Sequence, residues 1–400
     1  MANFSLKQQQ NKEEFVMKKW FASICLFLLM GIVIITASAK SPDKIKIGHL
    51  VALTGPSAVF GQSEETGLQI AVEEINKKGG LLGRQIEIVA LDTRSDPAEA
   101  VNAARRLISQ EKVFAIIGVA QSGVANAVAP IITREKIPTI ATAATNPTVT
   151  VDKDGTPKKF MFRVCFIDSF QGTVAAHFAF NKLNAKKASI LYDVGSDYSQ
   201  WLAKYFEDSF IQMGGKVAKE AYRTGELDFR APLTKIKSEQ PDVLFLPLIT
   251  KDAALAAKQA RELGIQCTFM GGDNWGTNDI VTIGGSAVNG AYFVTLASLS
   301  DPEIKSWINQ NEKRFRGPIV HNALMAYDAA MLLSFAVNKT GSFDGTKVAE
   351  ALEKATNVEV LTTDNFSIDS KTHDPLNRPA PVNQIVEGEF IFIEKYQVID

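Results

Sequence analysis

Ser122 and Thr145 are the residues best placed to do chemistry, because each hydroxyl follows a short apolar run at a point where a new segment can begin. The two runs lie within 116–123 and 139–147, and both stop at small residues. In a parallel sheet, strands end and helix N-termini begin at such points. Unpaired N–H groups at a helix N-terminus, helped by hydroxyls, can hold a carboxylate without a Lys or Arg. We therefore predict an anion site here.

A helix is predicted to begin at Ser122, because the apolar residues after it recur at helical spacing. These residues are Val124, Ala127, Val128 and Ile131. Pro130 lies inside the pattern and predicts a kink or an early end of the helix. The alternative is that Ser122 and Thr145 only cap the segments that follow them and bind no ligand.

Length and charge exclude several kinds of partner. At roughly 150 residues per domain, a chain of 400 residues predicts two or three domains. The 43 Lys and Arg residues nearly balance the 44 Asp and Glu residues, which leaves a net charge of −1. The sequence therefore offers no basic stripe for a nucleic acid and no acidic tail.

Residues 1–39 are interpreted as an N-terminal extension followed by a secretory signal peptide. Met17-Lys18-Lys19 gives a positive start, the stretch 21–35 is almost entirely apolar, and Ala37-Ser38-Ala39 fits a cleavage signal. Met17 is thus the expected start, and the periplasm or another extracytoplasmic space is the expected location. An uncleaved membrane anchor is the alternative, although the apolar run is shorter than the ~20 residues that a spanning helix needs.

Cleavage would leave two cysteines, Cys165 and Cys267. Export to an oxidising compartment permits a disulfide, but two distant thiols do not imply one. We expect two buried side chains that behave as small hydrophobic residues.

From residue 44 onward, strands and helices alternate, and the same order occurs twice. Each round consists of a strand, a helix, a Gly-Gly pair, a strand, an acidic residue, a helix and a strand. The predicted strands lie at 45–53, 86–91, 113–117, 188–192, 217–222 and 243–247. Within the first round, Asp96-Pro97 followed by Glu99 predicts a helix start. This alternation predicts parallel sheets with right-handed crossovers.

We therefore predict an α/β protein with two similar, doubly wound parallel-sheet lobes joined by a multi-strand hinge. Lobe 1 is expected to comprise residues 44–164 and 296–372, and lobe 2 residues 165–295 and 373–400. The crossings near 162–166 and 293–296 resemble strands, which favours a stiff hinge. Further helices are expected at 323–337 and 347–355, and an edge strand or hairpin arm at 387–396, with Phe390 and Phe392 on one side.

Enzyme signatures are absent from the sequence. The four histidines lack the spacing of metal ligands; they are His49, His177, His321 and His373. Ser122 does not lie in a G-x-S-x-G elbow, because Ala120 stands at the first glycine position. We expect no catalytic residue, metal or cofactor, and a hydrolase that uses Ser122 is kept as an alternative.

The chain from Lys44 to about Tyr396 resembles the leucine/isoleucine/valine-binding protein family, the type I periplasmic solute-binding components of ABC transporters. The matching motifs are Thr54-Gly55-Pro56 through Phe60-Gly61, Asn76-Lys77-Lys78-Gly79-Gly80, Asp96-Pro97, Ile117-Gly118 through Ser122, Ala143-Ala144-Thr145-Asn146-Pro147, Tyr198, and Gly225-Glu226-Leu227-Asp228-Phe229. The resemblance implies a Venus-flytrap protein that closes on a small zwitterion, foremost a branched-chain or other aliphatic amino acid. A membrane permease of an ABC transporter is the implied partner, and we expect a monomer.

The resemblance also implies how lobe 1 would bind the zwitterion. Ser122, the backbone of Ala143, and Thr145 would hold the α-carboxylate, which agrees with the anion site predicted above. Both charges of a buried zwitterion need hydrogen-bonding partners, so lobe 2 must supply the other half.

By the same resemblance, Tyr198 and Glu226 in lobe 2 would receive the α-ammonium, and Phe60 would line the side-chain pocket. Asp273 is a second candidate for the ammonium or for a polar side chain. Each residue also has a simpler reading: a surface aromatic for Tyr198, a solvated loop acid for Glu226, a turn acid for Asp273 and a loop anchor for Phe60.

The chain departs from the best-known members of this family at Ser95 and Gln121, where their lobe 1 disulfide would fall. One methylene changes binding by only ~1 to 3 kcal/mol, so the sequence does not identify the amino acid. A ligand-sensing receptor domain would use the same lobes but would need an anchor and a signalling domain. An amide, a short peptide or an aromatic acid is the alternative ligand.

Overall fold

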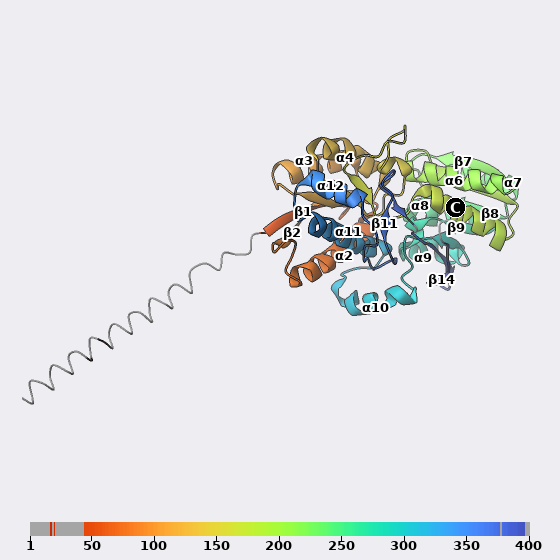
Figure 1. The fold of residues 1–400 in the computed structure, drawn as a ribbon. Coiled ribbons are helices and arrows are strands. Elements are labelled where there is room, and N and C mark those ends of the chain that lie inside the picture. Colours follow the sequence, from red (N-terminus) through yellow and green to blue (C-terminus); the bar gives the residue numbers. More distant parts are fainter. Residues whose placement is uncertain (1–16, 18–19, 21–43, 377, 397–400) are drawn as a thin grey trace, which may run out of the picture. The chain divides into compact units, whose positions relative to one another are not determined.

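The computed structural model describes residues 17, 20, 44–376 and 378–396 (Figure 1). The chain divides into two units, residues 1–44 and 45–400, and the second contains both sheets. The predicted signal peptide and its cleavage site fall outside the described residues. No described helix combines the length and the apolar character that a membrane span requires.

The first sheet has five strands in the order β2-β1-β3-β4-β5. Its strands are β1 (Lys44–Val51), β2 (Gln85–Asp92), β3 (Ala115–Gly118), β4 (Thr139–Ala141) and β5 (Met161–Arg163). β1, β3, β4 and β5 run parallel. Their carboxyl ends therefore meet at one edge, where the segments that carry Ser122 and Thr145 begin.

The second sheet has seven strands in the order β14-β13-β10-β9-β8-β6-β7. These are β6 (Lys187–Asp193), β7 (Lys216–Tyr222), β8 (Val243–Leu246), β9 (Thr268–Gly271), β10 (Tyr292–Val294), β13 (Ala380–Val386) and β14 (Glu389–Tyr396). β6 to β10 pair in parallel, whereas β13 and β14 add an antiparallel hairpin at one edge. β11 (Ser367–Ile368) and β12 (Pro375–Leu376) form a separate antiparallel pair.

Helices pack as neighbours around each sheet. In lobe 1 they are α2 (Ala58–Lys77), α3 (Pro97–Ser109), α4 (Ser122–Glu135), α11 (His321–Thr340) and α12 (Gly345–Glu353). The remaining helices are α5 (Asp168–His177), α6 (Asp197–Gln212), α7 (Arg230–Glu239), α8 (Thr250–Glu262), α9 (Asp279–Gly284) and α10 (Pro302–Asn311). α2 packs on α11, α3 on α4, and α5 on α6. These two α/β lobes confirm the predicted fold class.

The helix signals in the sequence act as expected. Asp96 caps α3, because its side chain accepts a hydrogen bond from the N–H of Glu99 at 2.9 Å and Pro97 is the first helical residue. Gly79-Gly80 follows α2 and Gly214-Gly215 follows α6. Gly80 and Gly214 have φ values of +77° and +90°, which glycine adopts without strain. The same stop signal thus ends the corresponding helix in each lobe.

Of the kink or early end predicted at Pro130, the early end does not occur, since α4 continues to Glu135. Pro130 is exposed, while Ala129, Ile131 and Ile132 beside it are buried. Packing of this apolar face therefore outweighs the backbone hydrogen bond that proline cannot make.

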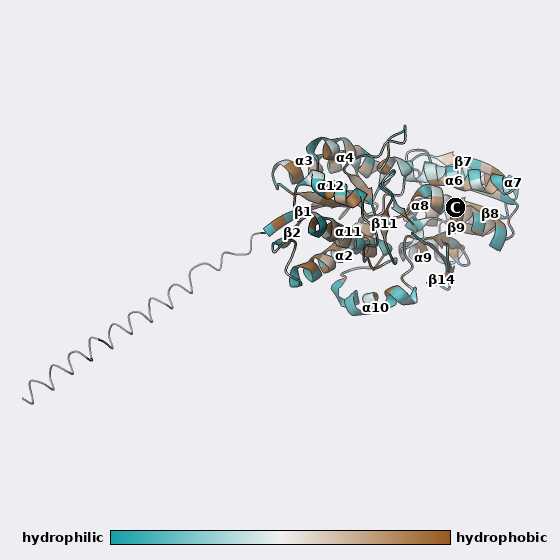
Figure 2. Ribbon diagram, viewed as in Figure 1, coloured by the Kyte–Doolittle hydropathy of each residue, from teal (hydrophilic) through white to brown (hydrophobic). Residues whose placement is uncertain are grey.

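Apolar side chains fill both lobes, and Figure 2 shows hydrophobic residues along the strands, whereas α10 is mostly hydrophilic. One cluster of buried residues runs from the first sheet through the hinge to part of the second sheet and α6. A second cluster lies within lobe 2 around Phe293 and the fully buried Trp275. Cys165 and Cys267 are both free thiols; Cys165 is buried and Cys267 is partly buried.

The chain passes between the two sheets three times, after β5, after β10 and after β12. Strand-like crossings were predicted near 162–166 and 293–296, and the lobe boundary predicted at 372–373 implies the third. The crossing after β12 brings β13 and β14 to the second sheet. The exact division of the chain between the lobes stays a prediction.

Candidate ligand-binding cleft

Ser122 reaches the cleft through a tight turn at the end of β3. Gly118 has a φ of +129°, and a Cβ there would lie 2.3 Å from the carbonyl oxygen of Leu50, so the turn needs glycine. Ser122 is the first residue of α4, and its buried Oγ accepts a hydrogen bond from the N–H of Asn146 at 3.2 Å. The hydroxyl is therefore not a helix cap, and its own proton remains available for a ligand.

Thr145 lies in the loop that follows β4, and it too has no capping role. Asn146, not Thr145, caps the short 3₁₀ helix Pro147–Val149, by accepting a hydrogen bond from the N–H of Thr148 at 2.8 Å. The side chain of Thr145 is fully buried. Its Oγ1 makes no hydrogen bond of standard length in the described part of the chain, although it lies close enough to the Asp168 carboxylate to lower the pKa of that acid. A buried polar atom without a partner is costly, which is a reason to expect a ligand there.

Arg163 supports this loop from β5, although the sequence analysis did not single it out. Its guanidinium is fully buried and donates to the carbonyl oxygens of Ala144 at 2.7 Å and Asn146 at 3.0 Å, on either side of Thr145. It also pairs with Asp374 at 2.6 Å. An arginine inside the apolar stretch Met161–Cys165 was the signal that could have found it.

A second group of polar side chains gathers on the lobe 2 side of the cleft. Asp168 begins α5, and its N–H donates to the carbonyl oxygen of Thr145 at 2.8 Å, so the two residues are adjacent. Asp273, at the end of β9, accepts a hydrogen bond from Gln171 Nε2 at 2.9 Å. A Cβ on Gly272 would lie 2.3 Å from the hydroxyl of Tyr198, which places that hydroxyl beside Asp273. Asp168, Gln171 and Gly272 were not predicted as site residues.

This group is electrostatically unsatisfied. Both carboxylate oxygens of Asp168 and the hydroxyl of Tyr198 are buried without a hydrogen bond of standard length in the described part of the chain, although Thr145 faces Asp168 and Tyr198 faces Asp273. Burial raises the pKa of Asp168 well above its ordinary value, and the charge of Asp273 raises it further. Burial also raises the pKa of Asp273 and of Tyr198. A cation placed among these groups would relieve the repulsion and restore the ordinary ionised state of the acids.

Phe60 lies on α2, is 7% exposed and belongs to neither buried apolar cluster. Its ring lies 5.7 Å from that of His321, whose Nδ1 is 3.3 Å from the hydroxyl of Thr295. Burial lowers the pKa of His321 to about 3, so the ring is neutral. A Cβ on Gly276 would be 3.0 Å from His321, which connects this wall to the turn that carries Asp273. Phe60 therefore belongs to an uncharged wall next to the polar groups.

Glu226 is not brought to this cluster. It is exposed in the segment after β7, and β7 is the outermost strand of the second sheet. Asp273 follows β9, which lies inside the sheet, separated from the edge strand β7 by β8 and β6. It contacts Gln171 of α5, and its charge acts on Asp168 at the start of that helix. Asp273, which the sequence analysis gave as the second candidate for the ammonium, is thus the acid that lies beside Tyr198.

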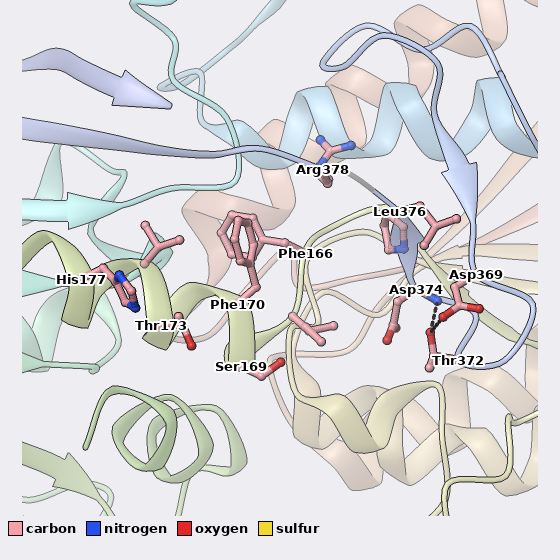
Figure 3. Close-up of a pocket in the computed structure, with 13 residues that line it drawn as sticks. Phe166, Ser169, Phe170, Thr173, His177, Asp369, Thr372, Asp374, Leu376 and Arg378 are labelled. Carbon is pink, nitrogen blue, oxygen red and sulfur yellow. Dashed lines mark hydrogen bonds between the residues drawn. The ribbon is translucent and has the colours of Figure 1, made fainter. Parts of the chain in front are cut away.

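The other side of α5 borders a separate cavity of about 400 Å³ at the hinge (Figure 3). Phe166 and Phe170 form one wall, and Leu376 lies on the segment opposite. The charged residues around it have protein partners: Arg378 pairs with Asp328 at 3.4 Å, and Asp374 pairs with Arg163. The unsatisfied acids therefore lie on the cleft side of the hinge.

Known proteins that resemble this chain in sequence are periplasmic and amino-acid-binding proteins. Residues 44–389 match the family model described as periplasmic binding protein. A leucine-, isoleucine-, valine-, threonine- and alanine-binding protein of Pseudomonas aeruginosa is 30% identical over 349 residues, which cover 86% of this chain and 91% of that protein.

Two solved structures share both fold and sequence with the chain. The leucine-binding protein LivK of Thermotoga maritima is 36% identical, with a TM-score of 0.81 over 88% of this chain and 98% of that one. LivJ of Streptococcus pneumoniae, a branched-chain amino acid transporter substrate-binding protein in complex with isoleucine, is 30% identical, with a TM-score of 0.80 over 89% of this chain and 99% of that one. The chain belongs to the periplasmic binding protein family.

Proposed function

We propose that this protein is the solute-binding component of an ABC importer and that its lobes close around an α-amino acid with an aliphatic side chain. The observation that carries the proposal is the pairing of unsatisfied groups across the cleft. The buried hydroxyl of Thr145 lies next to Asp168, and the charge of Asp168 is in turn close to that of Asp273.

Lobe 1 would take the α-carboxylate. The proton of the Ser122 hydroxyl and the hydroxyl of Thr145 are free to donate, and the first N–H groups of α4 have no carbonyl partner within the helix. The positive end of the helix dipole adds to the attraction. Ala143, in the same loop as Thr145, is placed to add a backbone contact.

Lobe 2 would take the α-ammonium. Asp273 and Asp168 supply negative charge, and the oxygen of Tyr198 supplies a further acceptor. This assignment moves the ammonium partner from Glu226 to Asp273, because Glu226 is exposed beyond the edge of the sheet. Phe60 and the neutral ring of His321 would face the apolar side chain.

The family and its relatives support the remainder of the proposal. The relatives described above are named for leucine, isoleucine and valine, and one is a transporter component. We propose that the closed form is presented to a membrane permease and that the predicted signal peptide delivers the protein to the periplasm. The protein acts by binding and release, without chemistry on its ligand.

A carboxylic acid or an amide is the competing ligand class. Such a molecule would fit the lobe 1 groups, but it would leave Asp168 and Asp273 buried without a cation, at a large cost in free energy. A thermal-shift screen over amino acids, amides and carboxylic acids separates these classes, because a ligand that binds only the folded state raises the melting temperature.

The test of the site compares two acid-to-amide variants by calorimetry with the amino acid found in that screen. Asp273→Asn should weaken binding by ~2 to 5 kcal/mol, because a desolvated ammonium loses a charged partner. Glu226→Gln is the matched control and should bind as the wild type does. Equal affinity of Asp273→Asn and the wild type would remove Asp273 from the site, and a screen without any amino-acid hit would contradict the proposed function.

A further inference from the structure

Glu64 is a buried acid directly behind the two loops that would hold the ligand carboxylate. It lies on α2, one turn after Phe60, and is 1% exposed. Its Oε1 accepts a hydrogen bond from the hydroxyl of Thr142 at 2.8 Å. Thr142 begins the loop that leads to Ala143 and Thr145, so the bond ties α2 to this loop.

The same threonine also reaches the other loop. Its N–H donates to the carbonyl oxygen of Gly118 at 3.0 Å, and its Oγ1 lies 3.3 Å from that oxygen. Gly118 starts the turn that leads to Ser122. Through its hydrogen bond with Thr142, Glu64 is therefore linked to both loops of the proposed carboxylate site.

α11 packs against α2 beside Glu64. α2 and α11 approach so closely that a Cβ on Gly67 would lie 2.1 Å from the carbonyl oxygen of Ala323. The amide of Asn322, near the start of α11, interacts with Glu64. The Oδ1 of Asn322 is buried and lacks a hydrogen-bond partner within the described chain. The hydrogen bonds from Thr142 and Asn322 both lower the pKa of Glu64, so its neutral form depends on burial.

Among the residues that the structure describes, no neighbouring cation neutralises an ionised Glu64. The titratable groups on the elements around it are His49 of β1 and His321 of α11, and burial lowers their pKa values to about 4 and about 3, so both are neutral. Arg163, behind the Thr145 loop, is engaged by Asp374. Glu65, next to Glu64 on α2, is only partly buried. Burial raises the pKa of Glu64 to about 8.

We infer that Glu64 positions the carboxylate-binding loops as a neutral, protonated side chain and that an amino acid binds preferentially in this protonation state. The inference rests on the proposed function. A negative charge behind the loops would repel the ligand carboxylate, whereas a neutral acid holds the loops without repulsion. Proton loss from Glu64 and ligand binding therefore oppose each other.

This opposition sets the direction in which ligand affinity changes with pH. As pH rises through the pKa of Glu64, the group becomes anionic and affinity falls. If binding raises that pKa by one unit, the anionic form binds about tenfold more weakly. Glu64→Gln keeps an acceptor oxygen in place of the carboxylate but cannot ionise, so its affinity should lack this pH-dependent component.

The test measures the Kd of L-leucine by calorimetry for the wild type and Glu64→Gln from about pH 6 to about pH 9. The ratio of the wild-type Kd to the variant Kd should start near unity and rise about fivefold by about pH 9, toward a limit of about tenfold at higher pH. Taking the ratio cancels titration of the ligand's own ammonium. Glu65→Gln is the matched control and should follow the wild type, and Glu64→Ala should bind weakly at every pH because the loops lose their support.

A ratio that stays constant across the range would overturn the inference. So would weak binding by Glu64→Gln at every pH. Absence of leucine binding by the wild type would instead count against leucine as the ligand of the proposed function. If Glu64→Gln does not fold, calorimetry of the wild type in buffers of different ionisation enthalpy replaces the ratio: proton uptake on leucine binding near the pKa of Glu64 is expected, and no uptake would contradict the inference.

Discussion

The side chain of Thr145 is fully buried, and Arg163 holds the carbonyl groups of the residues before and after it. Its hydroxyl makes no hydrogen bond of standard length in the described part of the chain. Such an atom lowers the stability of the ligand-free protein, and a carboxylate that accepts its hydrogen bond removes the penalty. Ser122 differs, because its Oγ already accepts a hydrogen bond from Asn146 and only its proton is free. We therefore regard Thr145 as the stronger of the two hydroxyl contacts.

Thr145→Val should weaken leucine binding by ~1 to 3 kcal/mol, because a carboxylate oxygen loses its donor in a buried site. The variant has nearly the same shape, so the fold should persist. Thr145→Ser restores the hydroxyl and should recover most of the affinity. Calorimetry of the three proteins checks this, and equal affinity of Thr145→Val and the wild type would leave the hydroxyl without a role in binding.

The residue scale also shows where sequence reasoning was limited. Tyr198 and Asp273 could be singled out from the sequence, and the structure places them together. Glu226 carried the same chemistry, but its strand, β7, lies at the edge of the sheet. Which loop reaches the cleft depends on the spatial order of strands, and the order β10-β9-β8-β6-β7 is not the order along the chain. Asp168 escaped notice because its position depends on the crossing between the lobes.

At the scale of elements, local sequence signals were sufficient to predict most helices and strands of the two lobes. Gly-Gly stops, the Asp96 cap and the alternation of strands with helices predicted both lobes, and all rest on interactions within a few residues. Short connections and small elements such as β11 and α9 were not predicted, since their conformation depends on tertiary contacts. The turn between β9 and the Asp273 segment is such a case, because Gly272 gives Tyr198 its room.

Gly272→Ala tests that turn. Its new Cβ would lie 2.3 Å from the hydroxyl of Tyr198 and 2.7 Å from Leu202, so the tyrosine must move. The backbone of Gly272 has a φ of −100°, which alanine tolerates, so the effect should be local. We expect leucine binding at least tenfold weaker, or about 1.4 kcal/mol.

Gly123→Ala is the control for this change. It lies beside Ser122, and its Cβ would meet nothing within 4 Å. It should leave leucine affinity near that of the wild type. If Gly272→Ala binds as tightly as Gly123→Ala does, the position of Tyr198 is not important for binding.

At the scale of the whole described unit, contacts join the lobes across the cleft. Asn126 Nδ2 lies 3.3 Å from Asp197 Oδ2, and Asn146 Nδ2 donates to the Asp197 carbonyl oxygen at 3.3 Å. The proposed site is complete only in this arrangement, because one lobe holds the hydroxyls and the other the acids. A ligand with both a carboxylate and an ammonium therefore stabilises closure, whereas a ligand with one charge engages only half of the groups.

The most direct test of this division is calorimetry with L-leucine and with 4-methylpentanoate, which has the same carbon skeleton but no ammonium. The account predicts that leucine binds more tightly by ~2 to 5 kcal/mol, because only leucine supplies a cation to Asp168 and Asp273. Equal or tighter binding of 4-methylpentanoate would contradict it, since the acids of lobe 2 would then have no part in recognition.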